Sequence, residues 1–266
     1  MREINFLTWN TQLYEMGNKL NEQKVVKEID MLTFKVVIKK VKDFLNSKKE
    51  AVAILQEIPF KCNIEGFNEH TLFSEFFKSF QNDKYVMLYN ITSERQIKMT
   101  VVLANKIGSE ELIYRKNNEL NNNMCVSFGI KDLDLSIIGV HPHNANELLN
   151  WLQVGGVPDI MLGDFNAGDY KKRYEDSKFK ANRDNYRKLI SGYTDMCNGQ
   201  NTRRVIFHNG FVYETPIDHI LIKNSSVFTK KYQCKNVEIE INEDNVSDHY
   251  PIYFKLLCLD EADRSQ

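Results

Sequence analysis

The most informative stretch of the sequence is Asp159-Ile-Met-Leu-Gly-Asp164-Phe-Asn166-Ala-Gly-Asp169. Its first half predicts a buried apolar strand that stops at a glycine. On an extended backbone, side chains at i and i+2 point the same way, so Asp164 and Asn166 are expected to face one small target. A carboxylate at a buried strand end loses hydration, which a divalent cation or a water activated for attack would compensate. The alternative is an Asn/Gly/Asp turn without chemistry, and this stretch alone does not choose between the two.

Polar side chains recur at the ends of the other predicted strands. They are Asn10, Glu57, His141, Asp218, Asp248 and His249. Taken singly, each has an ordinary explanation, such as a turn former, an exposed strand end or a buried structural histidine. Together they supply mainly oxygen ligands, which suit Mg²⁺ or Mn²⁺, whereas the scattered cysteines and histidines do not suit zinc. Two histidines beside such a cation indicate phosphate-ester chemistry, because both can share the charge of a phosphorane-like transition state.

Short strand-like runs alternate with helix-like runs along the chain. Apolar residues at helical spacing predict helices over about 21–46, 72–80 and 145–154. Strands are predicted over 4–9, 51–55, 85–89, 99–103, 125–129, 135–140, 205–207, 217–222, 237–241 and 250–257, besides the opening stretch. Many strands with helices outside them predict an α/β fold of two packed sheets flanked by helices. No repeat or linker divides the chain, so we expect a single domain over 1–258 and a polar tail over 259–266.

The composition is that of an ordinary soluble globular protein, with 266 residues, 42% of them hydrophobic and 27% charged. No apolar run approaches the roughly 20 residues that cross a bilayer, and the N-terminus is no secretory signal, so we expect a cytoplasmic protein without a membrane partner. The five cysteines form no CxxC pair, which fits reduced thiols better than disulfides or a zinc site. A net charge of −1 gives no overall attraction for nucleic acid, so any such binding depends on local patches.

Six motifs, in this order, resemble the endonuclease/exonuclease/phosphatase superfamily, which includes deoxyribonuclease I and exonuclease III-type enzymes. They are Trp9-Asn10, Gln56-Glu57, Gly139-Val-His141, Gly163-Asp-Phe-Asn-Ala167, Ile217-Asp-His-Ile-Leu221 and Ser247-Asp-His-Tyr-Pro-Ile252. The resemblance spans residues 9–252, and the fourth and sixth motifs together are highly specific. It implies a four-layer αββα sandwich of two mixed sheets, with the site at the rim where both sheets meet.

The resemblance also implies roles for the metal-side and water-side residues. Glu57 would be the principal Mg²⁺ ligand, assisted by Asn10 and Asp248, with Mn²⁺ as the alternative ion. Asp164 and Asn166 would orient and polarise the attacking water.

The histidines follow in the same way. Asp218 would pair with His249 and hold its tautomer, and a carboxylate partner favours the charged imidazole, which can bind a phosphate oxygen. His141 would donate to a phosphate oxygen or act as general acid to the leaving oxygen. Deoxyribonuclease I-like enzymes support this histidine with a Glu from an earlier strand, but residues 85–90 here hold no acid. His141 is therefore expected to rest on a backbone carbonyl or Asn90, and His143 is expected to be exposed to solvent.

A basic segment follows the opening motif directly. Residues 171–188 hold eight Lys/Arg against three acids, with Tyr174, Phe179 and Tyr186 interleaved. Positive charge with aromatic rings suits a polyanion whose bases can stack, although a solvated helix face explains the same pattern. The candidate substrate-binding residues are Lys171, Lys172, Arg173 and Arg203.

The first hypothesis is a Mg²⁺-dependent nuclease that hydrolyses phosphodiester bonds of nucleic acid by activated-water attack, as a monomer without an obligate protein partner. The alternative is a phosphatase or phosphodiesterase acting on a small-molecule or lipid phosphate. A catalytically silent binding module is disfavoured, because every expected catalytic position is filled.

Overall fold

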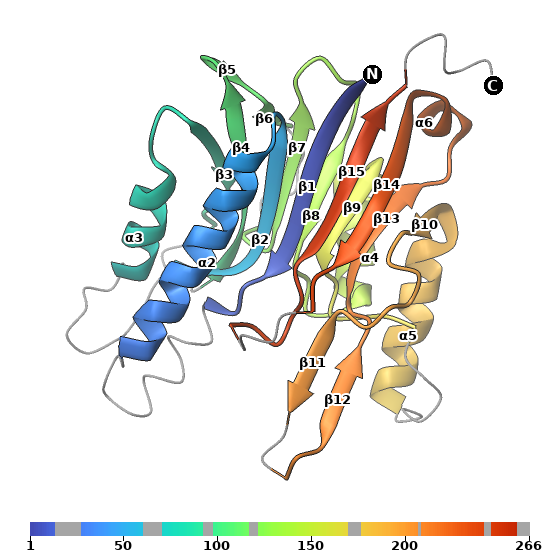
Figure 1. The fold of residues 1–266 in the computed structure, drawn as a ribbon. Coiled ribbons are helices and arrows are strands. Elements are labelled where there is room, and N and C mark those ends of the chain that lie inside the picture. Colours follow the sequence, from blue (N-terminus) through green and yellow to red (C-terminus); the bar gives the residue numbers. More distant parts are fainter. Residues whose placement is uncertain are drawn as a thin grey trace.

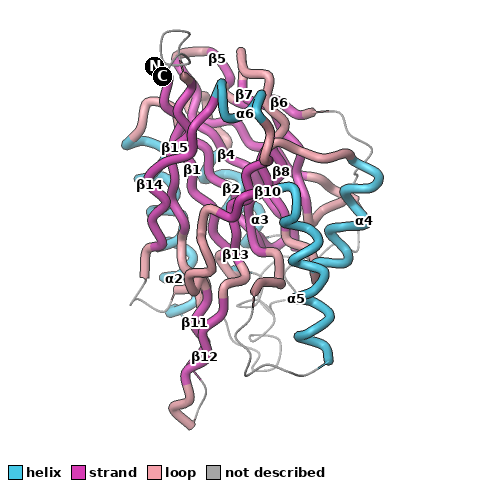
Figure 2. The backbone as a smooth tube through the Cα atoms, turned by 90° about the vertical axis from the view of Figure 1, so that its right-hand side faces the viewer, coloured by secondary structure: helices cyan, strands magenta, loops and turns pink. Residues whose placement is uncertain are grey.

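Two β-sheets pack face to face with helices on both outer faces (Figures 1 and 2). The computed structural model describes residues 1–13, 28–60, 71–92, 98–116, 122–169, 177–206, 209–241 and 246–259. This arrangement is the four-layer αββα sandwich, so the predicted fold class is confirmed. The predicted tail, 259–266, lies outside the described residues apart from Leu259.

The first sheet contains the N-terminal and C-terminal strands of the sandwich. Its strands are β1 (Arg2–Asn10), β2 (Ala51–Pro59), β3 (Tyr85–Tyr89), β4 (Lys98–Ile107), β5 (Glu110–Glu111), β14 (Tyr232–Ile239) and β15 (Ile252–Cys258). They are ordered β14-β15-β1-β2-β4-β3, and β5 also pairs with β4.

The second sheet is built from the middle of the chain. Its strands are β6 (Ile113–Arg115), β7 (Cys125–Ile130), β8 (Ile137–Val140), β9 (Ile160–Asp164), β10 (Tyr193–Asp195) and β13 (Asp218–Lys223), in the order β10-β13-β9-β8-β7-β6. The strands β11 (Arg203–Ile206) and β12 (Val212–Thr215) form a separate hairpin that extends beyond the sandwich (Figure 1).

The helices form the two outer layers. Side chains of α2 (Glu28–Ser47) and α3 (Thr71–Phe80) pack on the first sheet, and those of α4 (Ala145–Gly155) and α5 (Ser177–Leu189) pack on the second. A 3₁₀ turn, Ile190–Gly192, follows α5, and the short α6 (Ser226–Lys231) links β13 to β14. The helices predicted over 72–80 and 145–154 agree with α3 and α4 to within a residue, whereas residues 21–27 of the first predicted helix lie outside the described part. Within the described residues, no helix is both long and apolar enough to cross a membrane.

Alternation along the strands fills two cores at once. In β2, Val52 and Ile54 belong to the core between the sheets, while Ala53 and Leu55 belong to the core under α2 and α3. Successive side chains of a strand point to opposite faces, so a continuous apolar run is what a strand buried on both sides requires.

Strand direction brings the motif residues to one rim. β1 runs parallel to β2, and β8 runs parallel to β9, so all four strands end at the same side of the sandwich. β13 and β15 run antiparallel to β9 and β1, so their first residues lie at that rim. The rim is the lower end in Figure 1, beside the β11–β12 hairpin.

Several elements differ from the sequence-based expectation. The short strands β5, β6, β10 and β12 and the helix α6 are not among the predicted elements. β14 begins at Tyr232, five residues before the predicted strand, because it is an edge strand whose exposed polar residues mask its alternation. The basic segment over 171–188 overlaps α5, which was not predicted as a helix because most of its residues are polar. Among its described side chains, Tyr186 and Leu189 are the buried ones.

Candidate active site

Glu57 is turned into the rim by a β-bulge. The register of β2 against β4 shifts between Leu55 and Ile58, and Glu57 has a left-handed φ of 58°. A bulge of this kind inserts a residue that breaks the ladder and re-aims its side chain. The carboxylate is buried, with Oε1 2.9 Å from the Lys98 ammonium, while Oε2 has no hydrogen-bond partner among the described residues.

Asp164, the last residue of β9, lies at the centre of the site. Its Oδ2 accepts a hydrogen bond of 2.9 Å from the Asn10 amide at the end of β1, so the two sheets are joined here. The imidazole Nε2 atoms of His141 and His249 lie 3.5 and 3.8 Å from the same oxygen. Burial raises the pKa of Asp164, but the charges of His249 and His141 outweigh burial and hold that pKa below its usual value. The carboxylate is therefore ionised.

The backbone after Asp164 is a turn, so the expectation that Asp164 and Asn166 align on an extended chain is wrong. The Asp164 carboxylate accepts the Asn166 backbone N–H at 2.7 Å, and Asn166 has a left-handed φ of 47°. This is an Asx turn, in which a side-chain oxygen replaces a backbone acceptor. Asn166 still lies at the rim, where its amide donates to the Pro142 carbonyl at 2.9 Å.

Two glycines frame this turn because other backbone lies against them. Gly163 has φ 139°, and a Cβ there would lie 2.1 Å from the Val140 carbonyl oxygen. A Cβ at Gly168 would lie 1.8 Å from the Pro216 carbonyl oxygen. Both positions therefore require glycine, which explains the two glycines of the opening motif.

Asp218 and His249 form the pair that the resemblance implies. His249 Nδ1 lies 2.9 and 3.0 Å from the two Asp218 oxygens, and the Thr202 hydroxyl donates to Asp218 at 2.8 Å. Burial lowers the pKa of His249, but the Asp218 and Asp164 carboxylates outweigh burial and raise that pKa to about 9. The imidazole is charged near neutral pH, with its Nε2 side facing Asp164.

His141 is buried at the end of β8 without the support expected for it. Its Nε2 lies 3.4 Å from Glu57 Oε1, and its Nδ1 has no hydrogen-bond partner among the described residues. The Asn90 amide donates instead to the backbone carbonyls of Asn122 and Cys125. The expectation that His141 rests on Asn90 or on a backbone carbonyl is therefore wrong. The Asn90 amide instead holds the chain that leads into β7. His143 is exposed, as expected.

Asp248 divides its oxygens between an arginine and the site. Arg203 Nε and Nη2 lie 2.9 and 2.8 Å from Asp248 Oδ2. Oδ1 is buried without a hydrogen-bond partner in the described part of the chain, and it lies 3.5 Å from His249 Nε2. Arg203, a candidate substrate-binding residue, is thus held at the rim by Asp248. Lys171, Lys172 and Arg173 lie outside the described residues.

Tyr186 is not available for base stacking. It is 1% exposed, and its hydroxyl donates to Asp195 at 2.9 Å and lies 2.9 Å from His219 Nδ1. His219 Nε2 in turn donates to the Ala167 carbonyl at 2.7 Å. The sequence reasoning missed this network, which fixes the loop after Asp164. Strand alternation could have revealed it. His219 follows Asp218 in a strand, so its side chain must point to the opposite face of the sheet, toward α5.

The site contains side chains that could hold a metal ion. Potential ligand atoms of Asp164, Asp218 and His249 lie within 4.8 Å of one another. In that group, however, Asp218 and His249 are already hydrogen-bonded to each other. Among the residues that the structure describes, buried carboxylate oxygens without hydrogen-bond partners are found instead on Glu57 and Asp248, so these two fit the donor set of Mg²⁺ or Mn²⁺ better. Asn10 contributes less directly, because its Oδ1 accepts the Gln12 N–H at 3.1 Å and its amide holds Asp164.

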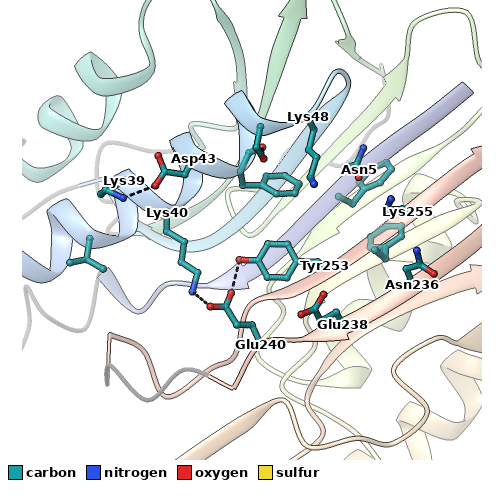
Figure 3. A pocket seen from close by; sticks show the side chains of 15 residues that line it. Asn5, Lys39, Lys40, Asp43, Lys48, Asn236, Glu238, Glu240, Tyr253 and Lys255 are labelled. Atoms are coloured by element: carbon teal, nitrogen blue, oxygen red, sulfur yellow. Dashed lines mark hydrogen bonds and ion pairs between the residues drawn. The ribbon is translucent and has the colours of Figure 1, made fainter.

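Two cavities differ in their relation to this centre. A cavity of about 470 Å³ adjoins the rim and is lined by His143, Asn144, Asn166, Ala181, Asn182, Asn185, Arg203, Tyr213, Thr215 and Ile217. A larger one of about 720 Å³, the outer groove, lies between α2 and strands β1, β15 and β14, and none of the predicted site residues lines it (Figure 3). Charged and aromatic side chains line the outer groove, and Lys40, Glu240 and Tyr253 are joined across it (Figure 3).

Solved structures with the same fold are found despite low sequence identity. TDP2 from D. rerio, complexed with a single-strand DNA product, is 13% identical, with 97% of this chain and 100% of that chain covered and a TM-score of 0.60. The endonuclease domain of TRAS1, a telomere-specific non-LTR retrotransposon, is 14% identical over 97% of this chain and 100% of that chain, with a TM-score of 0.54. The 3′ phosphatase NExo from Neisseria, bound to a product DNA hairpin, is 13% identical over 94% and 98%, with a TM-score of 0.54. No protein-family model and no curated protein sequence matches the chain. The likeness establishes the deoxyribonuclease I-like fold.

Proposed function

We propose that this chain, which has the fold of the endonuclease/exonuclease/phosphatase superfamily, is a metal-dependent phosphoester hydrolase acting on nucleic acid. The observation that carries the proposal is the surroundings of Asp164. A buried, ionised carboxylate lies beside two imidazoles and an amide, at a rim where further carboxylate oxygens have no partner within the described part of the chain. Burying charged groups in this way lowers the stability of the folded protein. Titratable groups with shifted pKa values cluster at catalytic sites.

Each side chain then has a role that its contacts support. Asp164 accepts a proton from the attacking water, because it is ionised and its position is fixed by Asn10 and by the turn at Asn166. Asp218 holds His249 in the charged form, so His249 Nε2–H donates to a non-bridging phosphate oxygen as negative charge develops.

His141 is the second histidine of the set. Its Nε2 shares the space between Glu57 and Asp164, where it donates to a phosphate oxygen or to the leaving oxygen.

Glu57 and Asp248, aided by Asn10, are the residues that would hold Mg²⁺ or Mn²⁺. When bound, the ion would supply positive charge to the phosphate.

Nucleic acid is the favoured substrate for two reasons. The cavity beside the rim offers amides, a hydroxyl and the Tyr213 ring, the groups that bind nucleobases by hydrogen bonds and stacking. The helix α5 adds exposed Lys180 and Lys188, and Arg187, which pairs with Asp169 at 2.6 Å, while Lys171, Lys172 and Arg173 stay candidate phosphate contacts. TDP2 and NExo, with the same fold, were solved with DNA.

A phosphatase acting on a terminal or small-molecule phosphate is the second candidate. NExo, which shares the fold, is a 3′ phosphatase, and the cavity of about 470 Å³ next to the proposed reacting centre is of the size that small ligands occupy.

The test is a substrate panel with purified protein and Mg²⁺ or Mn²⁺. Plasmid DNA, single-stranded DNA, RNA, 3′-phosphorylated oligonucleotides, nucleotides and phosphoinositides are incubated in parallel. Wild-type protein is compared with Asp164→Ala, Glu57→Gln and Asp43→Asn, the last being an exposed acid of the outer groove that serves as control.

We expect cleavage of nucleic acid that EDTA, Asp164→Ala and Glu57→Gln abolish and Asp43→Asn retains. Phosphate release from 3′ ends or nucleotides without strand cleavage would favour the second candidate. Full activity of Asp164→Ala would refute the assignment of the site.

A further inference from the structure

Lys98 is a cation built into the proposed metal site. It is the first residue of β4, and its ammonium lies 2.9 Å from Glu57 Oε1, with the two side chains only 20% and 9% exposed. The motifs that identify the site do not include it. Pairing of Lys98 with Pro59, next to the bulge at Glu57, puts the two side chains together.

Glu57 does not need Lys98 to find its orientation. The left-handed φ of 58° and the bulge aim the side chain from the backbone, and burial leaves it little freedom. His141 Nε2 also lies 3.4 Å from the same oxygen that Lys98 contacts. The contribution of Lys98 is therefore its positive charge rather than a geometry that only it can impose.

In the metal-free protein, the positive charge of Lys98 stabilises the buried Glu57 carboxylate. A buried carboxylate with one unpartnered oxygen is costly unless a cation lies nearby, and an ammonium at hydrogen-bond distance compensates. A divalent ion bound through Oε2 of Glu57 would share the carboxylate with the ammonium, and the two cations would repel each other at low dielectric.

We propose that Lys98 acts through Glu57 to stabilise the metal-free protein and to weaken its affinity for the divalent ion. The inference rests on the proposed function, in which Glu57 is the principal metal ligand. It makes the Lys98 ammonium a competitor of the metal ion for one carboxylate, so that the site fills only when the ion is abundant.

The experiment measures Mn²⁺ binding to the metal-free protein by titration calorimetry, together with the melting temperature with and without Mn²⁺. Wild type is compared with Lys98→Met, Lys98→Gln and Lys98→Arg. The matched control is Lys40→Met, since Lys40 is 21% exposed and pairs with Glu240 at 2.6 Å in the outer groove. Glu57→Gln reports on the metal ligand itself.

In Lys98→Met and Lys98→Gln, the metal-free melting temperature should fall and the Kd for Mn²⁺ should fall about tenfold, as expected when a nearby like charge is removed. The rise in melting temperature on adding Mn²⁺ should be larger than in wild type, and Lys98→Arg and Lys40→Met should keep the wild-type Kd. Lys98→Gln keeps a hydrogen-bonding side chain, so it tests the charge even where Lys98→Met folds poorly.

An unchanged or higher Kd in both neutral variants would overturn the role of Lys98. If Glu57→Gln binds Mn²⁺ as wild type does, the metal assignment in the proposed function has failed instead, and the inference fails with it.

Discussion

Two Lys–Glu pairs of this protein look alike and differ in what they leave unsatisfied. In the outer groove, Glu240 uses both oxygens, one on Lys40 at 2.6 Å and the other on the Tyr253 hydroxyl at 2.8 Å (Figure 3). At the rim, Glu57 uses one oxygen on Lys98, and the other is buried without a hydrogen-bond partner among the described residues. The outer groove is the larger cavity, yet both carboxylate oxygens of Glu240 have partners there. Unsatisfied buried oxygens, rather than cavity volume, therefore mark where a ligand is expected.

The largest effect should follow from removing the proposed base at the rim. Asp164→Asn keeps the shape and loses the charge, so hydrolysis should fall by about 10²–10⁴-fold, the usual contribution of a general base. The Asn10 amide would then face another amide, so a small loss of stability is also expected. Initial rates and a thermal melt of the same preparation separate the two effects. Near wild-type rates would show that the Asp164 carboxylate is no more important for hydrolysis than the charges of the outer groove.

The second effect concerns the charge on His249. Asp218→Asn removes the carboxylate that helps raise the His249 pKa to about 9, so the titration midpoint of this histidine should move toward its ordinary value. Since the charged imidazole is the active form here, activity should drop and its alkaline limit should move to lower pH. NMR titration of the metal-free protein measures the midpoint directly. An unshifted midpoint would show that Asp218 does not control the proton.

The same pKa sets a stability window. Because the folded-state pKa of His249 is raised above the ordinary value of about 6.5, its stabilising contribution is complete below that value and is lost as the pH rises through about 9. Urea unfolding of metal-free wild type should therefore show a fall in free energy between these limits, and Asp218→Asn should show a smaller one. Equal slopes in both proteins would contradict the pairing.

A smaller effect, on stability alone, is expected behind the rim. Tyr186→Phe removes the phenol, but Asp195 and His219 keep their own contact of 3.0 Å, so the free energy of unfolding should fall by about 0.5–1.5 kcal/mol, the usual net contribution of one hydrogen bond. The reacting groups themselves stay in place, so kcat should change little where the protein is folded. Urea titration with enzyme assays at low temperature tests both statements.

The smallest effect belongs to the outer groove. Glu240→Gln disrupts a pair whose side chains are 21% and 40% exposed, so solvent screening limits the loss to about 0–1 kcal/mol. Activity and Mn²⁺ binding should be unchanged. A large loss of activity would show that the outer groove contributes to function as the rim does.

Much of the site could be predicted because its residues can be recognised from the sequence immediately around them. Asp164 follows an apolar run that only a buried strand explains, and His249 and Asp218 stand at the start of two others. What failed were statements about conformation and neighbours. Asn166 lies in a turn because the Asp164 carboxylate competes for its backbone N–H. Tyr186 is buried because α5 packs its one apolar stripe on the second sheet.

Residue types and their spacing were enough to predict most of the strands, the two-sided burial that requires a layered sandwich, and the set of polar residues at the strand ends. These depend on residue type and short-range periodicity, which a chain displays without folding. The tertiary structure alone decided which oxygen of Glu57 is taken by Lys98, which oxygen of Asp248 faces Arg203, and how His249 meets Asp218. These are pairings between residues 31–45 positions apart, set by strand register and bulges, and no local pattern encodes them.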